Sequence, residues 1–121
     1  MIDYQDLPRR SGKTRELAKL YHNENGYFIV LNEHQKMIVL RYGVKHHDIF
    51  LYSEFLNMIY GNYMYNKVYF DEFGMQKKVN HRMLIDLDLN GLDVYVRGSN
   101  LSPLPNFFEC YLREKYPEMM F

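Results

Sequence analysis

The sequence lacks a second cysteine, a long apolar run and an excess of either charge, and each absence excludes a class of protein. A lone Cys110 cannot form an intramolecular disulfide or a cysteine-based zinc cluster, so we expect it to be a packed residue in a reducing compartment. No apolar run approaches the length of a membrane span, and the stretch "MIDYQDLPRR" carries acids where a signal peptide needs apolar residues. The sequence therefore predicts a soluble, cytoplasmic protein without a membrane partner.

The balance of charge argues against general nucleic-acid binding. Lys and Arg together number 15, as do Asp and Glu, so no overall positive field attracts a polyanion. One local basic cluster, "QKKVNHR" at 76–82, leaves a nucleic-acid-binding accessory factor as a further hypothesis. A solvated helix face explains the same cluster better.

Aromatic residues and methionine are abundant instead. The chain has 12 Tyr, 8 Phe and 8 Met, many of them in "FLNMIYGNYMYNKVYF". Because so short a chain cannot be expected to bury all of these side chains, part of them indicates a protein interface.

Apolar segments alternate along the chain between helical and strand periodicity. This alternation predicts a single domain over residues 1–121 with an α/β fold, in which helices flank a mostly parallel sheet in three layers. Strands are expected at 27–31, 48–52, 68–70 and 92–100, and helices at 12–22, 33–43, 53–60, within 75–91 and at 107–116. The first six residues alternate between apolar and polar, unlike a buried parallel strand. Either they form a short edge segment or the sheet lacks its usual first strand.

Two short motifs carry candidate chemistry. Ser11, Gly12, Lys13 and Thr14 run directly into an expected helix, whose N-terminal N–H groups bind anions, and the Lys13 ammonium adds positive charge there. Downstream, Asp71 and Glu72 follow an apolar strand. A hydroxyl beside the lysine and a carboxylate at a strand end suit Mg²⁺, which prefers oxygen ligands.

In this order, the motifs resemble those of P-loop NTPases of the phage terminase and helicase kind. "RRSGKT" is similar to their Walker A loop, "KVYFDEF" to their Walker B strand and "VYVRGSN" to their sensor strand, so the likeness spans about residues 7–100. The resemblance implies that Lys13 contacts the β- and γ-phosphates of ATP, that Thr14 and Asp71 hold Mg²⁺, and that Glu72 polarises the attacking water. It further implies that Arg9 and Ser11 with Gly12 complete the nucleotide-binding loop. Arg9 or Arg10 would stabilise charge, and Asn100 or Ser99 would sense the γ-phosphate.

The resulting hypothesis is an ATP- and Mg²⁺-binding protein encoded by a phage or mobile element, with weak or partner-dependent hydrolysis. A partner protein or a second copy of the chain could supply the arginine that so small an ATPase needs. The alternative is a non-catalytic interaction or inhibitor protein on a degenerate nucleotide-binding scaffold. Leu7 at the place of the loop's first glycine favours it, and its contacts would come from Tyr63, Tyr65 or Phe121.

The pair His46 and His47 with Asp48 is a poor metal site, because adjacent histidines point in different directions. His22, His34 and His81 are expected at the surface of helices.

Overall fold

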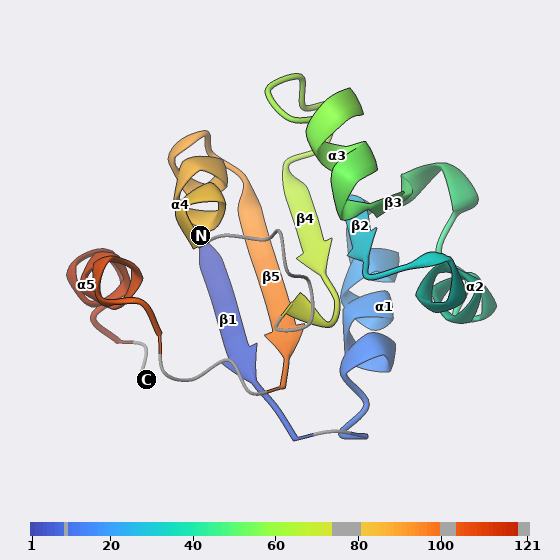
Figure 1. Cartoon of the computed structure of the whole chain (residues 1–121), viewed down its shortest axis with the longest axis horizontal. Helices are drawn as coiled ribbons and strands as arrows, with labels where there is room; N and C mark the ends of the chain where they lie inside the picture. Colours follow the sequence, from blue (N-terminus) through green and yellow to red (C-terminus); the bar gives the residue numbers. More distant parts are fainter. Residues whose placement is uncertain (9, 74–80, 100–103, 119–121) are drawn as a thin grey trace.

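Strands and helices alternate along the described part of the chain (Figure 1). The fold is given by a computed structural model, which describes residues 1–8, 10–73, 81–99 and 104–118. The strands are β1 (Ile2–Asp6), β2 (Tyr27–Val30), β3 (Ile49–Leu51), β4 (Lys67–Phe70) and β5 (Asp93–Gly98). The helices are α1 (Lys13–Asn23), α2 (Glu33–Arg41), α3 (Tyr52–Met58), α4 (His81–Leu89) and α5 (Asn106–Lys115).

The five strands form one sheet in the order β1-β5-β4-β2-β3, and every neighbouring pair is parallel. Helices cover both faces of the sheet, so the predicted α/β architecture of three layers is confirmed. The predicted boundaries agree with the observed ones to within a few residues for β2, β3, β4, β5, α1, α2, α3 and α5.

The first strand is present at one edge of the sheet. β1 pairs with β5 from Ile2 opposite Val94 to Asp6 opposite Gly98. Ile2 and Tyr4 are buried, whereas Gln5 is exposed. The polar and apolar alternation of this segment is thus that of an edge strand with one covered face, and of the two alternatives the edge segment is the one observed.

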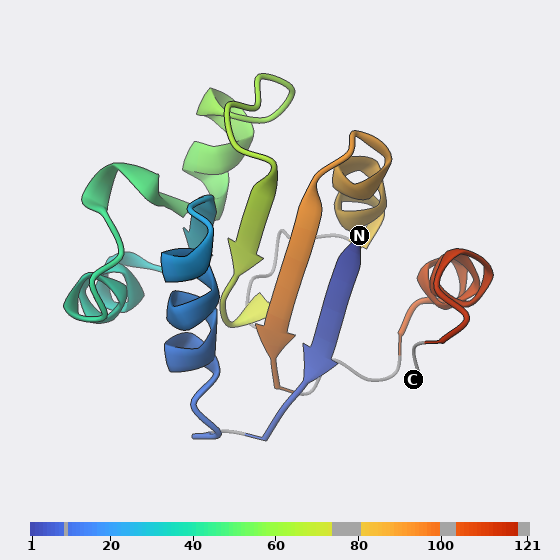
Figure 2. The same cartoon turned by 180° about the vertical axis from the view of Figure 1, so that it is seen from behind.

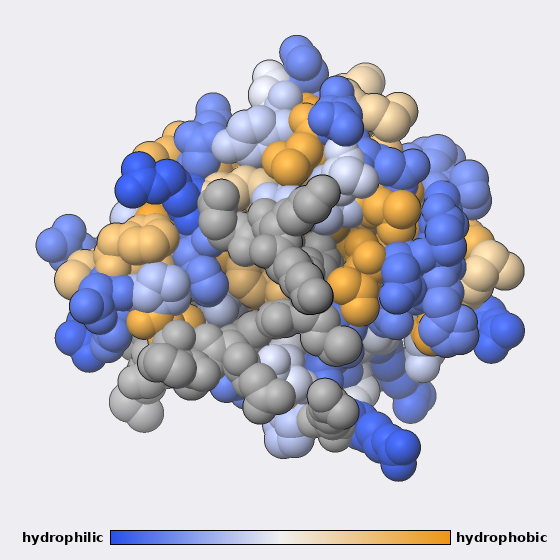
Figure 3. Space-filling model, viewed as in Figure 1, coloured by the Kyte–Doolittle hydropathy of each residue, from blue (hydrophilic) through white to orange (hydrophobic). Residues whose placement is uncertain are grey.

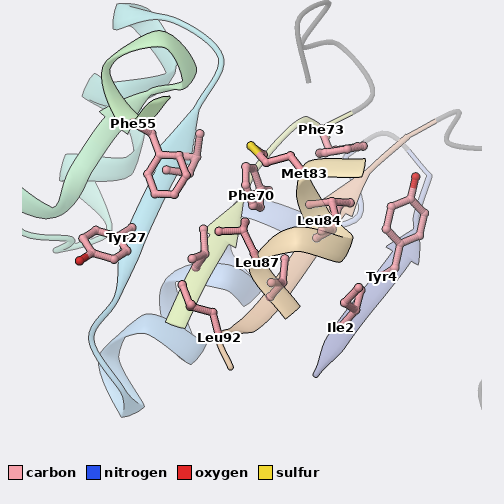
Figure 4. Packing of buried hydrophobic residues seen from close by; sticks show 14 of the residues in the cluster. Ile2, Tyr4, Tyr27, Phe55, Phe70, Phe73, Met83, Leu84, Leu87 and Leu92 are labelled. Atoms are coloured by element: carbon pink, nitrogen blue, oxygen red, sulfur yellow. The ribbon is translucent and has the colours of Figure 1, made fainter. Parts of the chain in front are cut away.

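The two faces have separate apolar cores. On the first face, α1 and α2 lie over the sheet (Figure 2). The core on this face includes Leu17, Tyr21, Phe28, Val39 and Tyr69. We call this the α1 face. On the opposite face, α3, α4 and α5 cover a larger cluster whose labelled members include Ile2, Tyr4, Phe55, Phe70, Phe73, Leu84 and Leu87 (Figure 4). We call this the α4 face.

Two expectations for single residues were wrong. Cys110 is exposed on α5 rather than packed. His81 is half-buried on the α4 face, where its Nε2 lies 2.9 Å from the Tyr4 hydroxyl, whereas His22 and His34 are exposed as expected. Burial lowers the pKa of His81. Among the residues that the structure describes, no helix has both the length and the apolar character that a bilayer span requires.

Candidate functional site

The motif residues gather where the parallel strands end. Because all strands run the same way, their carboxyl ends share one edge of the sheet. There β2 leads into α2 on the α1 face, while its neighbour β4 precedes α4 on the α4 face. Where the chain leaves two adjacent strands toward opposite faces of the sheet, a crevice forms between their carboxyl ends. Ligands of open α/β sheets bind at such crevices.

The loop between β1 and α1 starts from this edge. Its first residue continues the sheet, since the Leu7 N–H donates to the Gly98 carbonyl at 2.8 Å. Gly12, at the N-cap of α1, has φ 80°, and Arg10 has φ 60°. Two left-handed residues in three positions turn the chain sharply into the helix. The loop thereby places the first N–H groups of α1 at the strand edge.

Lys13 lies inside this loop. Its side chain is 5% exposed, and Nζ donates to the Pro8 carbonyl at 3.2 Å and to Ser99 Oγ at 3.0 Å. Ser99 Oγ in turn donates to the Leu7 carbonyl at 2.8 Å. Ser99, just after β5, therefore holds both the loop and the side chain of Lys13. The Lys13 ammonium is enclosed at the start of α1.

Thr14 and Asp71 meet although they lie 57 positions apart. The Thr14 hydroxyl donates to Asp71 Oδ2 at 2.7 Å, and Asp71 is fully buried at the end of β4. Burial raises the pKa of Asp71 above its ordinary value, and the charge of Glu72 adds to the rise, although hydrogen bonds from Thr14 and Gln35 oppose it. A nearby cation would stabilise the ionised form of this buried carboxylate.

Gln35 also contacts Thr14 and Asp71, and the sequence did not reveal this residue. Its Nε2 donates to Asp71 Oδ2 at 2.7 Å and lies 3.3 Å from Thr14 Oγ1. The position of Gln35 is set by the start of α2, where its backbone N–H donates to the Asn32 side chain at 2.8 Å. No motif marks this glutamine, because only the neighbouring positions of β2 and β4 bring α2 to Asp71.

Glu72 faces the lysine rather than open solvent. Its Oε1 lies 3.8 Å from Lys13 Nζ, and its side chain is 23% exposed. The backbone of Glu72 has φ 53°, a value that is uncommon for residues other than glycine. Arg10 and Glu72 are the two such residues in the described part of the chain, and both belong to the predicted site. Strain of this kind collects at functional sites.

Arg97 is the second residue that the sequence did not single out. It is 2% exposed, and its guanidinium bonds to Asp3 at 3.1 Å on β1 and to Glu16 at 2.9 Å on α1. Arg97 therefore links α1 to β1 and to its own strand, β5.

The structure brings together only part of the predicted set. Lys13, Thr14, Asp71, Glu72 and Ser99 converge. Ser11 and Arg10 are exposed at the turn, while Arg9, Asn100, Phe121 and most of the basic cluster 76–82 lie outside the described residues.

His46, His47 and Asp48 form a short 3-10 helix before β3. Within the described ranges, no group of three or more His, Cys, Asp or Glu side chains is arranged to hold a metal ion. His47 instead lies 3.5 Å from Asp48, whose carboxylate accepts hydrogen bonds from Tyr21 and Tyr65.

Comparison with known proteins identifies no family. No protein-family model matches the chain, and neither does any curated protein. A solved structure, a protein from Aquifex aeolicus whose description names no activity, is 20% identical with a TM-score of 0.47, covering 88% of this chain and 92% of that one. So distant a likeness carries no functional argument. The chain is therefore described by its architecture, an α/β fold with an all-parallel sheet. Polar residues collect at the carboxyl ends of its strands.

Proposed function

We propose that this protein binds ATP together with Mg²⁺ at the loop between β1 and α1, and that its hydrolysis is slow or depends on a partner. The observation that carries the proposal is the hydrogen bond of 2.7 Å between Thr14 and Asp71, next to the enclosed ammonium of Lys13. One hydroxyl, one carboxylate and one ammonium from two distant segments converge on the N-terminus of an 11-residue helix.

The donor set fits a magnesium nucleotide. Backbone N–H groups of the first turn of α1 and the Lys13 ammonium suit phosphate oxygens. Thr14 and Asp71 offer the oxygen ligands that Mg²⁺ prefers, and we infer that these two residues hold it. When bound, the cation would neutralise charge on the phosphates. The left-handed backbone of Arg10 and Glu72, which is uncommon for residues other than glycine, supports a loop shaped for a ligand rather than for stability alone.

The same geometry supports slow hydrolysis. Glu72, the candidate for positioning water, is engaged with Lys13 at 3.8 Å. Arg10 is exposed and lies on a turn. Activation would therefore require Glu72 to leave the lysine and a cationic group to approach the phosphates, which a partner protein or a second copy could supply. Phage or mobile-element origin and a cytoplasmic location remain predictions from the sequence.

The test compares three proteins. MgATP at millimolar concentration should raise the melting temperature of the wild type and of Glu72→Gln, because neither lacks the phosphate site. Lys13→Ala should lose the shift, since it removes the charge enclosed in the loop. Phosphate release should be slow in the wild type and lower still in Glu72→Gln.

Thr14→Ser is the matched control, because it keeps the hydroxyl that contacts Asp71. It should retain most of the thermal shift, whereas Thr14→Val should lose it. An equal shift in the wild type and in Lys13→Ala would show that ATP binds elsewhere.

The alternative, a non-catalytic interaction protein, is favoured by a different surface. A groove of about 640 Å³ lies between α3 and α4, lined by Tyr52, Leu56, Tyr60, Arg82, Met83, Ile85, Asp86 and Leu89. Apolar side chains reach the surface on this face (Figure 3), and Met58 and Leu89 are each 66% exposed. Tyr65 instead bonds to Asp48 at 2.9 Å, and Tyr63 stacks on Phe55, so these tyrosines serve the fold. On this alternative, MgATP leaves the melting temperature unchanged.

A further inference from the structure

The side-chain amide of Gln35 lies between the two oxygens that the proposed function assigns to the cation. Nε2 is 2.7 Å from Asp71 Oδ2 and 3.3 Å from Thr14 Oγ1. Because those two oxygens are themselves 2.7 Å apart, both lie on the same side of Nε2, with Asp71 Oδ2 as the shorter contact and Thr14 Oγ1 as the longer one. Thr14 simultaneously donates its own hydroxyl proton to Asp71. The three side chains form a closed hydrogen-bonded group.

This arrangement places positive charge where a cation would be attracted. The N–H groups present the positive ends of their dipoles to the carboxylate and the hydroxyl, as a cation with its bound water would do. A divalent cation that approached the same two oxygens would be repelled by those N–H groups. The amide and the cation therefore compete for Asp71 and Thr14 unless the amide turns.

Gln35 can turn without moving α2. Its backbone is fixed by the hydrogen bond to the Asn32 side chain at 2.8 Å. The terminal torsion of a glutamine is broad and nearly two-fold, so the torsion itself opposes little the rotation that exchanges the amide nitrogen for the amide oxygen. The cost of the rotation is the loss of the contacts to Asp71 and Thr14. The oxygen then faces the site as an acceptor.

We propose that Gln35 is a third residue of the cation site, which bonds as a donor to Asp71 and Thr14 without the cation and turns its oxygen toward a cation-bound water when the cation enters. This inference deepens the proposed function and rests on it for the identity of the cation site. It makes binding of the cation alone weak, because the amide must first be displaced. It also makes Gln35 a positioning residue, because it holds Asp71 and Thr14 in place while no cation is present.

Gln35→Glu tests the exchange, since it replaces a donor by an acceptor of the same shape. In EDTA the added carboxylate faces Asp71, and we expect the melting temperature to fall by about 4 °C or more. Mn²⁺ at millimolar concentration, without nucleotide, should restore it and raise it further than it raises the wild type. A variant with the melting temperature of the wild type in EDTA and the same response to Mn²⁺ would overturn the proposal.

Gln5→Glu is the matched control. Gln5 also donates its amide to an aspartate, Asp3, at 3.2 Å, but on the exposed edge strand. This variant should show neither the loss in EDTA nor the recovery with Mn²⁺. An equal response in both variants would assign the effect to added surface charge and would contradict the role of Gln35.

Wild-type protein provides a second measurement, in case Gln35→Glu does not fold. In NMR spectra of ¹⁵N-labelled protein, Mn²⁺ should broaden the side-chain amide signal of Gln35 at lower concentration than that of Gln5. Equal broadening would overturn the proposal. A separate result would count against the proposed ATP binding alone. In that case MgATP would not change the melting temperature of the wild type, while the Mn²⁺ effects at Gln35 would persist.

Discussion

At the scale of single residues, the backbone conformation of Gly12 is expected to affect both stability and binding of the proposed ligand. It has φ 80°, and a Cβ at this position would meet no atom within 4 Å, so any cost of a side chain comes from the backbone alone. We expect Gly12→Ala to lower the free energy of unfolding by about 1 kcal/mol. It should also weaken MgATP binding about tenfold, or about 1.4 kcal/mol, because the loop relaxes away from the start of α1. Chemical denaturation and calorimetry measure the two effects.

Gly61 provides the control, because it also has a positive φ but lies away from the candidate site. It has φ 90° in the turn after α3, and a Cβ there would also meet no atom within 4 Å. Gly61→Ala should destabilise the protein by a similar amount and leave MgATP binding unchanged. If both variants bound MgATP as tightly as the wild type, the conformation of Gly12 would have no part in the site.

Some residues of the candidate site could be predicted from the sequence and others could not, for a physical reason. Lys13 and Thr14 follow the loop directly, and Asp71 and Glu72 follow an apolar strand, so local order alone locates them. Gln35 and Arg97 act through partners at least 21 positions away. Their contacts depend on which strands are neighbours, and nothing in the sequence fixed the order β1-β5-β4-β2-β3 in advance.

At the scale of elements, Asp88 joins α4 to α5. Its buried carboxylate accepts hydrogen bonds from the Met1 amino group, Tyr111, Tyr116 and Lys115. Burial alone would raise the pKa of Asp88, but these hydrogen bonds outweigh it and lower the pKa to about 2. The ionised carboxylate is therefore a stabilising contact between the two helices.

Asp88→Asn should lower the free energy of unfolding by about 2 kcal/mol at pH 7, because hydrogen bonds to a charged acceptor are lost. The folded pKa of Asp88 lies below its unfolded value, so the stabilisation is fully present above pH 3.8 and is lost as the pH falls toward about 2. The difference between wild type and variant should therefore shrink over this range. Urea denaturation at a series of pH values measures it.

Asp86→Asn on the same helix is the control. Asp86 accepts a hydrogen bond from Tyr60 and lies toward α3 rather than α5. Its loss should cost about 1 kcal/mol. A difference for Asp88→Asn that stayed constant from pH 7 to pH 2 would contradict the ionised network.

Element prediction succeeded where burial left a clear pattern. β2 and β4 are apolar at nearly every position because both of their faces are covered, and such runs are readable in sequence. β1 was ambiguous, since an edge strand covered on one face alternates as an exposed segment would. It pairs with β5 across most of the sequence, and the contact of Arg97 with Asp3 across this pair joins residues 94 positions apart.

At the scale of the whole molecule, the fold and the site support one another. The parallel sheet brings the ends of β1, β4 and β5 to one edge, and Arg97 fastens α1 to that edge. The helix that would receive phosphate is thus tied to the sheet through Glu16, while Glu72 Oε1 lies 3.8 Å from Lys13 Nζ. Such a molecule is expected to bind its ligand more readily than it turns it over.

Calorimetric titration of MgATP into the wild type and Lys13→Ala tests the central claim most directly. The account predicts one binding site per chain in the wild type and no measurable heat of binding in Lys13→Ala. It predicts weaker binding when EDTA removes the magnesium. The absence of binding heat in the wild type, or equal binding by Lys13→Ala, would contradict it.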